Sequence, residues 1–172
     1  MGQQVIIFEG PDKVGKTEQA KELSRRLGIP YFKNADEHRY FLKDPGYFIH
    51  AVRYVDTYFT SFLEDTGTSI VLDRAWPSEW VYSRVFNRDT DMKVLEELDK
   101  RHSALGTTIV IPLRTSYVGI KDEYDSISKN LQLIHDTYVE FAKWTRCKVI
   151  MINVDDENLE REMNDIMGLM NV

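Results

Sequence analysis

The sequence predicts an α/β protein: a three-layer α/β/α sandwich built on a five-stranded parallel sheet. Three short runs are continuously apolar and rich in β-branched residues, as expected for strands that helices cover on both faces: Val5-Ile-Ile, Ile109-Val-Ile and Val149-Ile-Met-Ile. Longer segments with apolar residues at spacings of three and four, typical of amphipathic helices, separate these runs. Strands that alternate with helices in this way favour a parallel sheet.

The expected elements follow one another along the chain. Strands are expected at Gln4–Phe8, Pro30–Lys33, Ser69–Asp73, Thr107–Leu113 and Lys148–Val154. Helices are expected at Thr17–Leu27, Tyr47–Asp65, Ser78–Phe86, Met92–Leu105, Asp122–Thr145 and Asp156–Met167. The fifth helix carries an apolar stripe that predicts packing on the core, formed by Leu131, Ile134, Tyr138 and Phe141. No repeat or Gly/Pro/Ser-rich linker divides the chain, so residues 1–172 are expected to form a single domain.

The composition limits the class of protein. Of the 172 residues, 42% are apolar and 29% are charged, which is ordinary for a globular protein and unlike a disordered one. No apolar stretch has the length of a signal peptide or a membrane span, and the single cysteine, Cys147, fits a reducing compartment. We therefore expect a cytoplasmic protein without membrane contact. The net charge of −6 gives no strong nucleic-acid signal, because such binders normally present a basic face.

The segment after the first expected strand has the phosphate-binding pattern G-x-x-x-x-G-K-[ST]. Gly10 and Gly15 allow backbone N–H groups to wrap around a phosphate, and the following helix adds positive potential at its N-terminus. Lys16 is expected to reach the β and γ phosphates, and the Thr17 hydroxyl to bind Mg2+. ATP is therefore the expected phosphoryl donor, bound by Gly10, Pro11, Asp12, Lys13, Val14, Gly15, Lys16, Thr17 and Glu18.

The third expected strand ends in an acid followed by a base, Asp73 and Arg74. A carboxylate at the end of a strand beside the phosphate loop can bind Mg2+ directly or through water. An adjacent arginine can reach phosphate oxygens and neutralise charge in the transition state. Asp73 is therefore expected to join Thr17 in binding Mg2+, and both Asp73 and Arg74 to act in catalysis. The alternative is that Asp73 caps the next helix and Arg74 makes a surface ion pair.

These residues resemble the thymidylate kinase family of P-loop nucleotide kinases, over almost the whole chain. Residues 8–17, F-E-G-P-D-K-V-G-K-T, are similar to the opening of that family. The resemblance implies that Asp12 contacts the 3′-hydroxyl of the acceptor sugar. It also implies a catalytic role for Lys13, which stands where one subgroup has an arginine that touches the transferred phosphoryl group. Lysine keeps the charge of that arginine and loses its bidentate fork.

The same resemblance assigns residues to the acceptor pocket. Residues 73–83, D-R-A-W-P-S-E-W-V-Y-S, are similar to the family segment D-R-Y-x-x-S-x-x-A-[YF]-[QT], with Ser83 in place of the longer Gln or Thr that reads the pyrimidine edge. Arg53 stands where the family has an arginine on the bound monophosphate, and Ile49 where the family has a stacking phenylalanine. The other implied acceptor contacts are Asp12, Lys33, Phe48, Arg74, Ser78, Tyr82 and Tyr124, the last lying beneath the sugar, where it excludes a 2′-hydroxyl.

The segment after the fourth expected strand, residues 114–123, is expected to be a short lid. It is not rich in arginine, and Arg114 is expected to close over ATP together with Lys121. A short lid with a basic residue in the phosphate loop resembles the subgroup that supplies the phosphoryl-stabilising charge from the loop. The resemblance therefore implies a compact, divergent member of the family, and it implies a homodimer.

The expected activity is ATP- and Mg2+-dependent phosphorylation of a deoxynucleoside monophosphate, with dTMP or a related pyrimidine nucleotide as the acceptor. One open alternative is a deoxynucleoside kinase, which would need a carboxylate base after the second strand; Asp36 and Glu37 are the candidates. A kinase that acts on a modified nucleotide or on a base within DNA is another alternative. The non-enzymatic alternative is an ATP-binding switch or scaffold without turnover of an acceptor.

Overall fold

A five-stranded parallel sheet forms the centre of the molecule. The computed structural model describes residues 2–34 and 46–172. The strands are β1 (Val5–Phe8), β2 (Tyr31–Lys33), β3 (Ile70–Asp73), β4 (Thr108–Leu113) and β5 (Lys148–Asn153), in the spatial order β2-β3-β1-β4-β5. All four pairs of neighbouring strands are parallel. The expected sheet is confirmed, and each expected strand differs from the observed one by one residue at one end.

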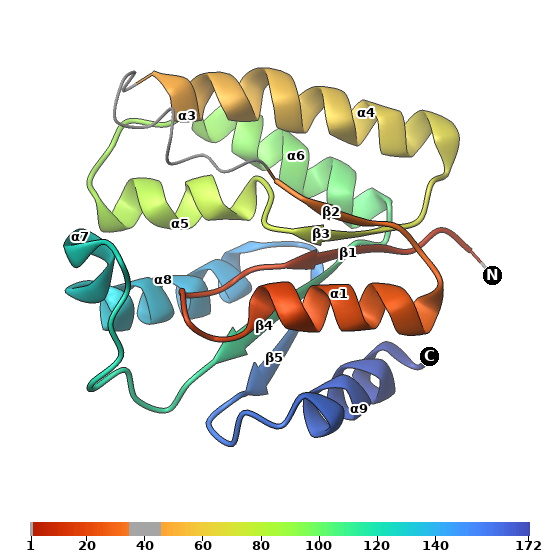
Figure 1. The fold of residues 1–172 in the computed structure, drawn as a ribbon. Coiled ribbons are helices and arrows are strands. Elements are labelled where there is room, and N and C mark those ends of the chain that lie inside the picture. Colours follow the sequence, from red (N-terminus) through yellow and green to blue (C-terminus); the bar gives the residue numbers. More distant parts are fainter. Residues whose placement is uncertain (1, 35–45) are drawn as a thin grey trace.

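Helices cover both faces of this sheet (Figure 1). On one face, α1 (Lys16–Leu27) packs on β1, β2 and β3, and α9 (Leu159–Met170) packs on β5 and on α1. On the other face, α5 (Pro77–Val85) packs against α6 (Met92–Ala104) and α8 (Leu131–Trp144). The three-layer α/β/α arrangement is confirmed.

One long helical segment passes beside α6 at the β2 edge of the molecule (Figure 1). It begins as α3 (Tyr47–His50), continues as a π-helical stretch, η1 (Ala51–Asp56), and ends as α4 (Thr57–Thr66). The helix expected over Tyr47–Asp65 is therefore present, with a wider turn in its middle. Short π-helical stretches are frequent at functional sites, and three η1 residues, Ala51, Val52 and Asp56, line a cavity at the carboxyl ends of the strands.

The core lies between the sheet and its helices. All four residues of β1 are at most 1% exposed, as the continuously apolar run predicts. The stripe on α8 is confirmed as a core face, because its members are at most 2% exposed: Leu131, Ile134, Tyr138 and Phe141. Trp76 and Trp80 add edge-to-face contacts with Phe141, which fixes α5 against α8.

The single helix expected over Asp122–Thr145 is wrong, because two helices occupy this segment: α7 (Asp125–Ser128) and α8. Hydrogen bonds from side chains to the backbone compete with the helix here. The Asp122 carboxylate accepts the N–H of Tyr124 at 3.0 Å, and the Ser128 hydroxyl accepts the N–H of Asp122 at 2.7 Å. Asn130 then leaves the helical region, with φ −114° and ψ 8°, immediately before α8 begins.

The last expected helix, Asp156–Met167, is displaced along the sequence. It begins only at Leu159, because Asn158 caps the first turn by accepting the N–H of Arg161 at 3.0 Å. It ends at Met170, where Asn171 adopts a left-handed conformation with φ 63°.

The topology leaves a crevice between β1 and β3. These strands are neighbours, yet β1 leads into α1 on one face of the sheet and β3 leads into α5 on the other. Adjacent strands whose connections leave in opposite directions open a binding crevice at their carboxyl ends.

Within residues 2–34 and 46–172, no helix combines the length and the apolar character that a bilayer span needs.

A buried histidine on α6 predicts how stability depends on pH. His102 is 2% exposed and lies between the hydroxyls of Thr60 and Thr107, at 3.1 and 3.0 Å. Burial lowers its pKa to about 4. The unfolded chain therefore takes up a proton that the native state excludes, and the free energy of unfolding should fall by about 3 kcal/mol as the pH drops from about 6.5 to about 4.

Urea unfolding at pH 7 and pH 4.5 measures this effect. The variant His102→Gln keeps a donor and an acceptor, and we expect it to lose much less stability on acidification than the parent protein. His135→Gln is the matched control, because His135 bonds to Tyr117 outside this buried site. Equal pH dependence in all three proteins would contradict the assignment to His102.

Candidate active site

The crevice at the carboxyl ends of β1 and β3 opens into a cavity of about 820 Å3. The loop between β1 and α1 and the end of β3 line one part of it. Helices α3, η1 and α5 and the segment around α7 line the rest. A cavity of this volume is within the range of sites for small molecules and cofactors.

The loop of residues 9–15 has the backbone of a phosphate cradle. Gly10 has φ 138°, and a Cβ atom at this position would lie 3.0 Å from the carbonyl oxygen of Pro112 on β4. Only glycine allows that approach. Gly15, with φ 79°, is the N-cap of α1, so the N-terminal amides of this helix face the cavity end of the loop. Gly10, Pro11 and Val14 form the buried side of the loop, whereas Lys13 and Gly15 are exposed at the cavity.

Lys16 is buried beneath the cavity, at 7% exposure. Its ammonium group donates to the carbonyl of Pro11 and lies 3.9 Å from a carboxylate oxygen of Asp12. Burial, together with the nearby charge of Arg74, lowers the pKa of Lys16 to about 7. A group at this pKa is poised to gain charge when an anion arrives.

If the loop binds nucleotide phosphates, as the sequence predicts, the lowered pKa of Lys16 means that binding should take up a proton. The phosphates of ADP would raise the pKa of Lys16, so at pH 8 binding should take up about one proton per site, and affinity should fall as the pH rises above about 7. Calorimetric titration with ADP in two buffers of different ionisation enthalpy measures the uptake. Lys16→Arg is the control, because arginine stays charged throughout this range. Binding without proton uptake in the parent protein would contradict the prediction.

Two oxygen ligands suitable for Mg2+ lie beside the loop. The Thr17 hydroxyl donates to the Asp73 carboxylate at 2.6 Å, and Asp73 is 2% exposed at the end of β3. Tyr31 on β2 donates to the same carboxylate oxygen at 3.0 Å, which holds the side chain in place. Burial and the charge of Asp73 raise the pKa of Tyr31 to about 12, so its hydroxyl remains a donor. Hydroxyl and carboxylate oxygens are the ligands that Mg2+ prefers beside nucleotide phosphates.

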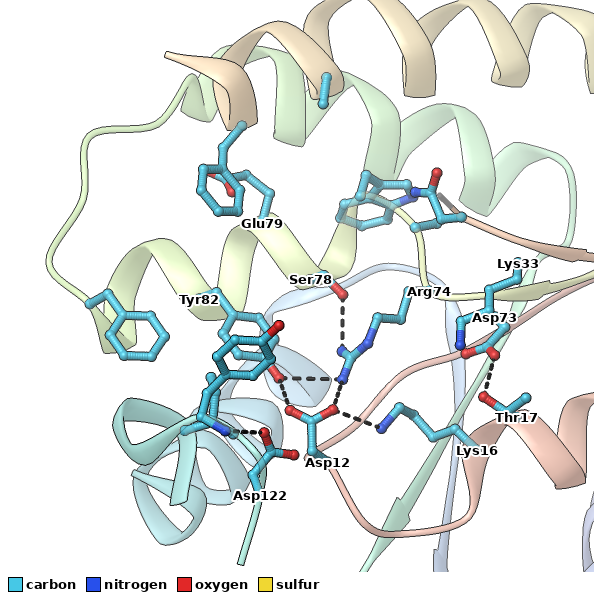
Figure 2. A pocket seen from close by; sticks show the side chains of 18 of the residues that line it. Asp12, Lys16, Thr17, Lys33, Asp73, Arg74, Ser78, Glu79, Tyr82 and Asp122 are labelled. Atoms are coloured by element: carbon cyan, nitrogen blue, oxygen red, sulfur yellow. Dashed lines mark hydrogen bonds and ion pairs between the residues drawn. The ribbon is translucent and has the colours of Figure 1, made fainter. Parts of the chain in front are cut away.

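Arg74 extends from the end of β3 towards the loop, as Figure 2 shows. Its backbone is left-handed, with φ 68°, and this conformation turns the chain from β3 towards α5. The guanidinium donates to Asp12 at 2.8 Å, to Tyr138 at 3.2 Å and to Ser78 at 3.3 Å. The alternative of a surface ion pair is therefore wrong for Arg74: its side chain is 21% exposed, pairs with Asp12 and lines the cavity.

Glu9 lies directly behind Arg74 and is completely buried. One of its carboxylate oxygens accepts the N–H of Ala75 at 2.8 Å, and the other accepts the hydroxyls of Ser78 and Tyr138, both at 2.8 Å. The second oxygen lies 3.6 Å from the Arg74 guanidinium. Burial raises the pKa of Glu9, and the charge of Arg74 and these hydrogen bonds oppose that rise. Glu9 thus connects the start of the loop to Arg74 and α5.

Aromatic and polar side chains line the other part of the cavity. Phe48, Tyr82, Phe86 and Tyr124 supply the aromatic surfaces, and Lys33 approaches from the end of β2. The Tyr82 hydroxyl lies between Arg74 and Asp12, at 3.4 Å from each (Figure 2). An ion pair between Glu79 and Arg88 also lines this part.

Apart from Gly10, Pro11 and Val14 on the buried side of the loop, four expected site residues within the described part of the chain lie outside this cavity. Arg53 is exposed and donates to Asp91 at 2.6 Å. Ser83 is buried outside the cavity, and its hydroxyl donates to the carbonyl of Trp80 at 3.3 Å. Ile49 is half-buried beside the cavity-lining Phe48.

Arg114 is the fourth of these residues. It begins the segment of residues 114–124, which connects β4 to α7 without a helix or strand. Its guanidinium donates to the carbonyl of Lys13 at 3.0 Å and to Glu157 at 2.8 Å. These bonds fasten the expected lid to the outer side of the phosphate loop.

Sequence reasoning missed Glu9, Tyr31, Glu79 and Arg88. A signal existed for Glu9, because an acid that directly follows a buried strand needs a partner, and Arg74 follows the neighbouring strand. No comparable sequence signal marks Glu79 and Arg88. Glu79 lies within α5 and Arg88 lies after its end, so their pairing depends on how the chain turns there. The candidate bases Asp36 and Glu37 lie outside the described residues.

No protein-family model and no curated protein matches this chain. Among solved structures, the YorR protein from Bacillus subtilis in complex with phosphorylated GDP has a TM-score of 0.69 and 22% identity, over 97% of this chain and 95% of that one. Thymidylate kinase from Ehrlichia chaffeensis has a TM-score of 0.63 and 13% identity, over 100% of both chains. Deoxyadenosine kinase from M. mycoides, with the products dCMP and dCDP bound, has a TM-score of 0.61 and 18% identity, over 98% of this chain and 99% of that one. This chain has the α/β fold that these P-loop kinases share.

Proposed function

We propose that this chain is a Mg2+- and ATP-dependent kinase that phosphorylates a deoxynucleoside monophosphate. One observation carries the proposal: the phosphate loop, the Thr17–Asp73 pair and Arg74 converge at one part of a single cavity whose other part is walled by aromatic and polar side chains. A donor site that opens directly into an acceptor-sized space is the arrangement that phosphoryl transfer requires.

The residues divide the work of phosphoryl transfer between them. The backbone of the loop and the N-terminus of α1 would bind the phosphates of ATP, and Lys16 would neutralise charge on the transferring group. Arg74 is close enough to Asp12 and the loop to contact the same group, with Lys13 at the exposed rim. Thr17 and Asp73 would hold Mg2+, which neutralises phosphate charge when bound.

The acceptor would occupy the space between Arg74 and Tyr124. Asp12 would contact its sugar, and Lys33 would contact its phosphate from the end of β2. By name, the structural neighbours include a nucleotide kinase, thymidylate kinase, and a nucleoside kinase, deoxyadenosine kinase with the products dCMP and dCDP, so they support an acceptor that is a nucleotide or a nucleoside. The expectation of dTMP or a related pyrimidine nucleotide is the finer form of this proposal, and the residues that bear on the base are treated below.

A coupled assay of ADP release tests the proposal. Deoxynucleosides and their monophosphates, each with all five common bases, are offered with ATP and Mg2+. We expect turnover with at least one monophosphate and much lower turnover with the corresponding nucleoside. ATP binding without turnover of any acceptor would overturn the proposal and would indicate a switch or scaffold.

A second candidate is a deoxynucleoside kinase, and the position of Arg53 favours it. The resemblance assigns Arg53 to the acceptor phosphate, yet its guanidinium pairs with Asp91 outside the cavity. A site that lacks this arginine has less charge for a phosphorylated acceptor and suits an unphosphorylated one better. The same assay separates the two candidates, because efficient turnover of nucleosides alone would establish the second.

A further inference from the structure

Glu79 and Arg88 form a bidentate ion pair in the wall of the acceptor part of the cavity. The two carboxylate oxygens of Glu79 accept from the two terminal nitrogens of Arg88 at 3.1 and 2.9 Å. Glu79 projects from α5 on the side that faces α3, away from Arg74 (Figure 2). It is 5% exposed, and a carboxylate this buried is retained at a cavity wall only with a partner.

The Arg88 guanidinium is held on its other side by Phe48. Its central carbon lies 3.6 Å from the centroid of the Phe48 ring, at a distance typical of a cation–π contact. Phe48 on α3, Glu79 on α5 and Arg88 after α5 therefore form one rigid unit that lines the cavity. This unit is unsuited to a phosphate, because the carboxylate of Glu79 would lie beside it and Arg88 is already neutralised.

The pair retains hydrogen-bonding capacity for a ligand. Arg88 has five N–H donors, and the bidentate contact with Glu79 uses one from each terminal nitrogen. Each carboxylate oxygen of Glu79 can accept more than one hydrogen bond. Within residues 2–34 and 46–172, Arg88 is the only residue that donates to it, so Glu79 can accept a further hydrogen bond from a ligand. The unit therefore presents an acceptor directly beside donors, the same pattern that an Asn or Gln amide presents to a base.

Nucleobases differ in how they match this pattern. On the hydrogen-bonding edge of cytosine and adenine, an amino group stands at one end and the acceptor atoms follow it. The amino group can therefore donate to Glu79 while an acceptor atom of the base accepts from Arg88. Guanine places both of its donors on one side and its carbonyl on the other. Thymine and uracil place their single N–H between two carbonyls. When that N–H donates to Glu79 and one carbonyl accepts from Arg88, the second carbonyl lies against the carboxylate.

We propose that Glu79 and Arg88 read the base of the acceptor and select an amino-bearing base over thymine and uracil. This inference rests on the proposed function, from which it takes a nucleotide acceptor. It assigns base reading to a pair that replaces Ser83 and Arg53, whose side chains lie outside the cavity. It also changes the expected acceptor from dTMP to a nucleotide of cytosine, adenine or guanine.

The test compares kcat/KM for dCMP, dAMP and dGMP with kcat/KM for dTMP and dUMP. We expect the best amino-bearing substrate to exceed both imide substrates by at least about tenfold, the discrimination typical of one mismatched base contact. In Glu79→Gln the carboxamide can rotate to donate to a carbonyl, so the difference should shrink to within about threefold while KM for ATP is unchanged. Arg88→Lys loses the fork and should also reduce the difference.

Glu64→Gln is the matched control. Glu64 also makes a bidentate pair with an arginine, Arg101, between α4 and α6 on the outer surface. This variant should keep the base preference of the parent protein. Thermal melting of each variant establishes that it is folded at the assay temperature, and the preference is a ratio within one protein, so a change in the folded fraction does not alter it.

Two results would overturn the inference and leave the proposed function intact: turnover of dTMP or dUMP equal to that of the best amino-bearing substrate, or an unchanged preference in Glu79→Gln. If no monophosphate is turned over, the proposed function fails, and calorimetric binding of the monophosphates and nucleosides in the presence of ADP decides the inference separately. Tenfold tighter binding of the amino-bearing bases would support it. Equal binding of all bases, or no binding, would overturn it.

Discussion

Replacing Lys16 by methionine should lower kcat by a factor of at least about 10²–10³ and leave the protein folded. The ammonium group lies under the loop that would bind the ATP phosphates, where a preorganised charge stabilises the transferring phosphoryl group. Methionine has a similar length and no charge. Steady-state kinetics with ATP and the best acceptor from the substrate panel measure the effect.

The same variant should be as stable as the parent protein or more stable, by up to a few kcal/mol in the absence of nucleotide. Burial lowers the pKa of Lys16 to about 7, so the empty native state holds this charge at a cost, and an apolar side chain of similar volume removes that cost. Lys143→Met is the control, because Lys143 is exposed on α8 and paired with Glu140. Full activity in Lys16→Met, or a large loss of stability, would contradict this account of the site.

The fold could be predicted because its strongest determinants are local. The central strands β1, β3 and β4 are short apolar runs buried on both faces, and such runs mark their own ends by a change of polarity. The expectation that β5 is covered on both faces is wrong, because this edge strand alternates in burial and Met151 is 50% exposed. The break between α7 and α8 depends on the hydroxyl of Ser128 meeting the backbone of Asp122, six residues earlier. Apolar spacing carries no information about such a contact, so the sequence predicts one continuous helix there.

The two parts of the cavity also differ in how far the sequence alone predicts them. The phosphate loop is a contiguous segment whose backbone does the binding, so Gly10, Gly15, Lys16 and Thr17 are recognisable by spacing alone. The acceptor part is assembled from α3, η1, α5 and the segment around α7, and which side chains face it depends on the rotation of each helix. Two successive residues of α5 show this: Tyr82 lines the cavity, whereas Ser83 is buried outside it.

The second large effect is expected on kcat when Glu9 is replaced. Glu9 does not line the cavity, but it contacts Arg74 and Ser78, which do. Glu9→Gln keeps the shape of the side chain and removes the charge 3.6 Å from Arg74. The amide oxygen can still accept the hydroxyls of Ser78 and Tyr138, while the amide NH2 replaces the acceptor of the Ala75 N–H, so one hydrogen bond is lost. Arg74 keeps its bond to Asp12 and loses the charge behind it, which weakens the hold on its position. We expect kcat to fall by about 10–100-fold, with KM for ATP within about threefold of the parent value. Glu9→Ala should in addition lower the free energy of unfolding by about 3–5 kcal/mol, because it leaves a buried charge network without one partner.

The variant Asp99→Asn is the control that distinguishes an effect on the position of Arg74 from an effect on the stability of the protein. Asp99, on α6, is also completely buried and pairs with an arginine, Arg146, but it contacts the residues just before β5, at the amino ends of the strands, whereas the cavity is at their carboxyl ends. This variant should lose stability in urea unfolding and keep its kcat per folded molecule. Glu9→Gln should show the reverse, with a small loss of stability and a large loss of kcat. If Glu9→Gln keeps full kcat, the contacts of Glu9 hold α5 against the sheet and do not direct Arg74.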